Sequence, residues 1–106
     1  MTRTLLEMKA EVLKALGHPT RLAIVELLGA SEERCVCELV DCAGGGDRTT
    51  VSKHLAILKS VGLVSDRKEG LRVFYRLNCP CLLPFIACIE QAVRDRVREE
   101  SAALAR

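Results

Sequence analysis

Residues 48–60 read RTTVSKHLAILKS, and two short runs of alternating polarity follow, LVSDRK at 63–68 and LRVFYRL at 71–77. In the first segment, hydroxyl and charged side chains occupy one face of a helix, and apolar side chains recur on the opposite face. The apolar positions are Val51, Leu55 and Leu58. The two runs are joined at Glu69-Gly70, a sequence suited to a tight turn. These residues predict a helix with one polar face, followed by a small β-hairpin.

Further helices are predicted on both sides of this segment. Apolar stripes indicate helices over 5–16, from Pro19 to Gly29, over 35–43, and after Pro80. Asp47 is placed to cap the helix at 48–60 through the N–H of Thr50, and His18 precedes the second helix. The order is that of a winged helix-turn-helix. We therefore expect a mainly α fold with a small β-hairpin wing (α+β), forming a single domain over residues 1–106.

The distribution of charge favours an anionic partner. The chain carries a net charge of +2, yet residues 48–76 hold seven basic and two acidic side chains, so this segment is +5 and the remainder is −3. A basic middle suits a protein that places one face on nucleic acid. Phe74, Tyr75 and Phe85 are the only aromatic residues, which argues against a base-stacking platform for single strands. A length of 106 residues also argues against a two-domain enzyme with an interdomain cleft.

The polar face of the helix at 48–60 is the candidate DNA-binding element. A helix fits the major groove, where its N-terminal side chains reach base edges and phosphates. The alternative is an ordinary solvent-exposed amphipathic helix, but the basic hairpin that follows favours DNA. The predicted DNA-binding residues are Arg48, Thr49, Thr50, Ser52, Lys53 and His54 in the helix, and Arg67, Lys68 and Arg72 in the wing.

Four short motifs occur in a recognisable order: HPTRL at 18–22, CVCEL at 35–39, VSKHL at 51–55 and GLV at 62–64. Over about residues 8–90 the chain resembles the ArsR/SmtB family of metal-sensing repressors, and CVCEL is similar to the box of its arsenite- and cadmium-type members. The resemblance implies a homodimer that joins through its first and last helices. It also implies that the apo form binds operator DNA and that an inducer releases it.

Six cysteines are a high number for a chain of this length. The N-terminal residues mix charges with apolar side chains, unlike a signal peptide, so we expect a cytoplasmic protein whose thiols bind metal or sense redox state. Cys35 and Cys37 lie in the box, but residues two apart on a helix point about 200° apart. They can clasp one ion only where the chain at Cys35 is extended or the first turn unwinds. The alternative is that both cysteines simply pack as small apolar side chains.

A third thiolate is needed for three-coordinate arsenic. Val40 occupies the position where arsenic-type members often carry a third cysteine, so the nearby Cys42 is the first choice. The alternative third ligands are Cys79, Cys81 and Cys88 in the C-terminal segment. That segment lacks the histidine and carboxylate pattern of zinc-sensing members, which favours a thiophilic inducer.

The sequence therefore predicts a homodimeric repressor of double-stranded operator DNA, released by As(III) or Sb(III), with no required cofactor and no membrane contact. One alternative is a thiol-redox or persulfide-sensing repressor of the same fold, and another is a Cd, Pb or Zn sensor. A thiol oxidoreductase or metal buffer is disfavoured by the absence of Cys-x-x-Cys and by the basic hairpin. No nucleophile–base pair or phosphate loop is present, so we expect no enzyme activity.

Overall fold

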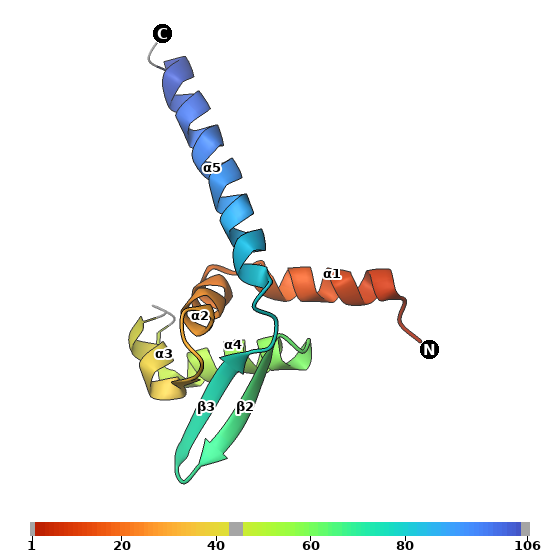
Figure 1. Cartoon of the computed structure of the whole chain (residues 1–106), viewed down its shortest axis with the longest axis vertical. Coiled ribbons are helices and arrows are strands. Elements are labelled where there is room, and N and C mark those ends of the chain that lie inside the picture. Colours follow the sequence, from red (N-terminus) through yellow and green to blue (C-terminus); the bar gives the residue numbers. More distant parts are fainter. Residues whose placement is uncertain (1, 43–45, 105–106) are drawn as a thin grey trace.

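The computed structural model describes residues 2–42 and 46–104, and Figure 1 shows the order of its elements. Three helices, α2, α3 and α4, gather beside a small sheet, whereas α1 and α5 project away from it. The helices are α1 (Leu5–Leu16), α2 (Pro19–Gly29), α3 (Val36–Cys42), α4 (Arg48–Ser60) and α5 (Leu82–Leu104); the strands are β1 (Arg34–Cys35), β2 (Val64–Glu69) and β3 (Arg72–Leu77). This is the predicted mainly helical fold with a β-hairpin wing.

The sheet contains one strand more than the sequence predicted. All neighbours are antiparallel, in the order β1-β3-β2, and Cys35 pairs with Phe74 at the middle of β3. The prediction of a two-stranded ribbon and of a helix beginning at Cys35 is therefore corrected, because Arg34 and Cys35 extend along β3 and α3 begins at Val36. A strand of two residues is too short to produce an alternating pattern. The predicted end of this helix at Ala43 lies outside the described residues.

Helix α4 has the predicted bounds and the predicted cap. The Thr50 N–H donates to Asp47 Oδ1 over 2.8 Å, which satisfies one of the free donors at the start of the helix. The apolar face of α4 is fully buried against α2 and the base of the wing. The largest buried side chains are Ile24, Val25 and Leu28 of α2, Leu39 of α3, Val51, Leu55 and Leu58 of α4, and Val64 of β2. The core therefore fixes α4 and leaves its polar face in solvent.

The hairpin turns at Gly70, as predicted. Its φ of 63° lies in the left-handed region, which glycine adopts without the steric cost that a β-carbon brings. The register pairs Glu69 with Arg72 and Val64 with Leu77, so β2 and β3 are matched along their whole length.

Helices α1 and α5 keep large apolar side chains in solvent. No residue of α5 is buried in the single chain. The exposed apolar residues of the two helices are Leu5, Leu6, Met8 and Leu13 on α1, and Phe85, Ile89, Val93, Val97 and Leu104 on α5. Exposed apolar surfaces of this kind are typical of protein–protein contacts. Across the described ranges, none of the helices has the length and apolar character needed to cross a membrane.

Candidate DNA-binding surface and cysteine pairs

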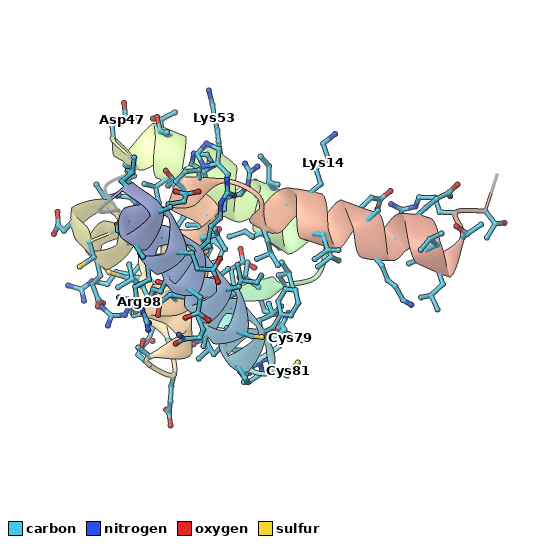
Figure 2. All side chains as sticks on the ribbon, turned by 90° about the horizontal axis from the view of Figure 1, so that it is seen from above. Lys14, Asp47, Lys53, Cys79, Cys81 and Arg98 are labelled. Atoms are coloured by element: carbon cyan, nitrogen blue, oxygen red, sulfur yellow. A yellow bond between two sulfur atoms is a disulfide. The ribbon has the colours of Figure 1, made fainter. Side chains whose placement is uncertain are left out.

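The exposed face of α4 carries most of the predicted DNA-binding residues. Arg48, Thr49, Ser52 and Lys53 line one shallow hollow on this face, and Thr50 is exposed beside them. Figure 2 shows Asp47 and Lys53 projecting from the same edge of the molecule. The side chains thus stand free of the core, as contact with a DNA groove requires.

The tip of the wing presents a second basic group. Lys68 and Arg72 are exposed on β2 and β3, close to the turn. Leu71 between them is fully exposed, at 100%. The wing therefore offers two cations at the end of a narrow ribbon, which suits contact with the phosphate backbone.

Arg67 differs from the other predicted DNA-binding residues, because its guanidinium is already paired. It donates to both carboxylate oxygens of Glu33 over 2.8 and 2.6 Å and to Glu69 over 2.7 Å, and it lies 4.7 Å from the ring centre of Phe74. These contacts raise the pKa of Arg67 and lower the pKa of Glu33. The arrangement ties β2 to the segment before β1, so a contact between Arg67 and DNA would have to compete with these exposed ion pairs.

His54 also lies apart from the exposed face of α4. Its ring is half-buried, 4.6 Å from the ring of His18, and Arg21 Nη1 donates to His54 Nδ1 over 3.2 Å. Burial, followed by the neighbouring His18 and Arg21, lowers the pKa of His54. The neutral ring therefore accepts from Arg21 and holds α4 against the junction of α1 and α2. In the sequence, this partial burial of His54 was indicated by its position three residues after Val51, beside the apolar stripe.

Cys35 and Cys37 are joined in a disulfide, with their Cα atoms 5.4 Å apart. Cys35 is buried on β1, and Cys37 is exposed in the first turn of α3. Of the two conditions under which these sulfurs were expected to come together, an extended chain at Cys35 or an unwound first turn, the structure has the first, because β1 ends at Cys35. A helix beginning at Cys35 would have kept the two side chains apart.

The disulfide faces the two DNA-binding elements. Cys35 and Cys37 line a cavity of about 190 Å³ together with Arg48 of α4 and Arg72 of β3, and the remaining lining comes from Val36, Leu71 and Val73. In addition, Cys35 is bonded to β3 through the strand ladder. A change at either sulfur is therefore adjacent to both the start of α4 and the wing.

The other four cysteines are free thiols, and two of them meet. Cys79 Sγ and Cys81 Sγ lie 3.1 Å apart, between β3 and α5. Cys42, at the end of α3, and Cys88, on α5, are exposed. Within residues 2–42 and 46–104, no three side chains of Cys, His, Asp or Glu come together to hold one ion. The structure thus assembles two pairs of sulfurs, and among the described residues no third Cys, His, Asp or Glu side chain joins Cys35 and Cys37 in one cluster.

A winged helix-turn-helix with an exposed polar helix and a basic wing defines a DNA-binding regulator. The family described as "Bacterial regulatory protein, arsR family" matches residues 18–66. The chain belongs to this family. It is a transcription regulator and not an enzyme, as the sequence predicted.

Three relatives illustrate the similarity. The arsenic resistance transcriptional regulator ArsR2 of Pseudomonas putida is 43% identical over 68 residues, which are 64% of this chain and 58% of that protein. The repressor SmtB of Mycobacterium tuberculosis is 47% identical over 75 residues, 71% of this chain and 54% of SmtB. The chain thus spans little more than half of these two relatives. The homodimeric winged helix-turn-helix domain of Mb0332 from Mycobacterium bovis has a TM-score of 0.74 and 35% identity, covering 90% of this chain and 86% of that domain.

Replacing Lys53 with alanine is expected to weaken DNA binding and to reduce the slope of log affinity against log salt by about one unit, because one phosphate contact is lost. Thr50→Ala should change sequence preference more than salt dependence. The measurement is fluorescence anisotropy on a labelled duplex at several salt concentrations. Arg98→Ala, which removes an exposed cation from the face of α5 opposite Ile89, is the control. An unchanged salt slope for Lys53→Ala would contradict the assignment of α4 to the DNA interface.

Proposed function

We propose that this chain is a homodimeric transcriptional repressor that binds operator DNA and is released when As(III) or Sb(III) binds its cysteine thiolates. Cys35 and Cys37 supply two of the ligands, and Cys42 is the first choice for the third, with Cys79, Cys81 and Cys88 as alternatives. The observation that carries this proposal is the cavity that Cys35 and Cys37 share with Arg48 and Arg72. As a DNA-binding regulator it would act in the cytoplasm.

The proposed binding to DNA is based on the exposed side chains of α4 and the wing. Arg48, Thr49, Thr50, Ser52 and Lys53 would enter the major groove, and Lys68 and Arg72 would contact phosphates. Because one chain presents a single such helix, two half-sites require two chains. The exposed apolar faces of α1 and α5 support pairing through these helices, and the Mb0332 domain is itself homodimeric.

The release step follows from ligand geometry. Arsenic(III) is soft, prefers thiolates and takes three of them in a pyramid, so it requires the reduced form of Cys35 and Cys37. Placing an ion between these sulfurs separates them from the positions they hold as a disulfide. Because Cys35 is bonded to β3 and the cavity also contains Arg48, this displacement would shift the wing and the start of α4 together. The start of α4 and the wing would then no longer have the relative position that fits the operator.

The disulfide favours a second candidate, a thiol-redox repressor of the same fold. In this mechanism an oxidant takes two electrons from the Cys35 and Cys37 thiols, two protons leave, and the S–S bond forms. The exposed position of Cys37 gives an oxidant access to the pair. Oxidation and arsenite binding compete for the same two sulfurs, so a titration can separate the two signals.

The test follows release of the reduced protein from a duplex that it selects from a random DNA pool. Arsenite should release the wild type but neither Cys35→Ser nor Cys37→Ser, because a serine hydroxyl stays protonated and is a poor ligand for a soft ion. Both variants should still bind DNA. X-ray absorption of the arsenite-bound protein should show three As–S bonds.

Three parallel measurements identify the signal and the third ligand. Loss of the response in Cys42→Ser supports a site within α3, whereas loss in Cys79→Ser, Cys81→Ser or Cys88→Ser supports a site completed by the C-terminal segment. Release by diamide alone, with no effect of arsenite, supports the redox repressor. Release by Cd²⁺, Pb²⁺ or Zn²⁺ at lower concentrations than arsenite would identify that metal ion as the inducer in place of arsenite. Full arsenite response in both Cys35→Ser and Cys37→Ser contradicts the proposal.

A further inference from the structure

A second Cys-x-Cys pair lies at the junction of the wing and α5. Cys79 Sγ and Cys81 Sγ are 3.1 Å apart, and neither is part of the disulfide. The hydrogen bond between the two sulfurs raises the pKa of Cys79. Figure 2 shows both side chains together near the base of α5. Two free thiols that already point toward each other form a chelating pair.

The turn that carries this pair is held at its start by Asn78, the residue before Cys79. The N–H of Asn78 donates to the carbonyl of Leu63 over 2.9 Å, and its Nδ2 donates to the carbonyl of Gly62 over 3.1 Å. The hydroxyl of Ser65 donates to Asn78 Oδ1 over 2.7 Å. Pro80, between the two cysteines, fixes its own φ. The pair is thus preorganised, and binding across it requires little loss of conformational freedom.

The pair is separate from Cys35 and Cys37. Cys35 pairs with Phe74, and β3 continues from there for three residues, about 10 Å, to Leu77 before the chain reaches Cys79. The cavity at Cys35 and Cys37 does not include Cys79 or Cys81 in its lining. In Figure 2, Cys79 and Cys81 lie on the side of the molecule opposite Lys53. A ligand at this pair would leave the exposed face of α4 uncovered.

The number of donors selects the ligand. Across the described ranges, no third Cys, His, Asp or Glu completes a cluster with these sulfurs. An ion that requires three or four protein ligands is therefore poorly served here. A soft centre that already carries one fixed substituent, and needs only two thiolates, matches the pair.

We propose that Cys79 and Cys81 form a second, independent site in each chain, which takes a trivalent arsenical bearing one carbon substituent. The arsenic(III) oxide R–As=O reacts with both thiols. Two As–S bonds form, the As–O bonds break, and the oxygen leaves as water with the two thiol protons. Arsenic stays trivalent, so the step needs no oxidant or reductant. The product is a cyclic dithioarsinite that links Cys79 to Cys81 across Pro80.

The experiment measures how many phenylarsine groups bind, and it does not depend on release from DNA. The protein carries Cys42→Ser and Cys88→Ser, is reduced with a phosphine, and is treated with phenylarsine oxide before intact-mass spectrometry. We expect two phenylarsine groups per chain, one on each pair. Adding Cys35→Ser and Cys37→Ser should leave one group, and adding Cys79→Ser and Cys81→Ser instead should also leave one. Circular dichroism checks that each variant is folded.

Three outcomes would overturn the site. One is complete loss of phenylarsine from the Cys35→Ser/Cys37→Ser protein, which would mean that the four sulfurs act as a single site. Another is unchanged binding of two groups when Cys79 and Cys81 are both serine. The third is an adduct at Cys79 and Cys81 that survives excess 2,3-dimercaptopropanol, because a dithioarsinite must exchange onto that dithiol. The two proposals can fail separately. If phenylarsine binds Cys79 and Cys81 as expected but arsenite does not release the protein from DNA, the proposed release by arsenite is contradicted and the second site is supported.

Discussion

Replacing Ile89 with glutamate is expected to abolish dimerisation and, with it, high-affinity operator binding. Ile89 is 49% exposed in the single chain, and it borders an apolar groove with Leu13 and Leu16 of α1 and Phe85 of α5. If a second copy covers this face, the substitution buries an unpaired carboxylate, which costs several kcal/mol. Light scattering should therefore report a monomer or aggregate, and anisotropy should report loss of operator binding, because two half-sites need two copies of α4.

The matched control is Gln91→Glu, which introduces the same charge on the same helix at a position about 200° around from Ile89. Gln91 is exposed and donates to Asp95, so this change should cost only a few tenths of a kcal/mol. The control protein should stay dimeric and bind DNA. A folded Ile89→Glu dimer that binds the operator as the wild type does would show that the partner does not pack on this face of α5.

The fold was predictable from sequence where the signal was local. The bounds of α4, its Asp47 cap and its three buried side chains all follow from residues within one helix. The turn at Gly70 follows from the hairpin pattern. By contrast, β1 exists because Arg34 and Cys35 find Tyr75 and Phe74, some forty residues away in the chain. A strand of two residues is too short to show a periodic pattern in the sequence.

The same distinction explains the candidate site. The exposed row on α4 is visible in the sequence because polar residues alternate there with core positions. The pairing of Arg67 with Glu33, and that of His54 with Arg21, join residues more than thirty positions apart. The cavity shared by Cys37, Arg48 and Arg72 likewise depends on how α3, α4 and the wing pack. Charge and residue type identify candidates, but packing decides which of them are free to meet a partner.

The core beneath α4 leads to a second large effect, the loss of stability expected for Leu55→Ala. Leu55 has no exposed surface and lies in the cluster that joins α4 to α2 and the base of the wing. Truncating a buried leucine removes apolar contacts and leaves a cavity, at a cost of about 2–5 kcal/mol. Because a domain of this kind is stable by only about 5–15 kcal/mol, the urea midpoint should fall substantially.

Leu71→Ala makes the same chemical change at the tip of the wing, where the leucine is fully exposed, so its free energy of unfolding should stay within about 0.5 kcal/mol of the wild type. All three proteins are unfolded in urea at one concentration, because the stability of a dimer depends on concentration. Equal losses in the two variants would mean that α4 is not anchored through Leu55. A loss confined to Leu55→Ala would show that the polar face of α4 is held in place by its buried one.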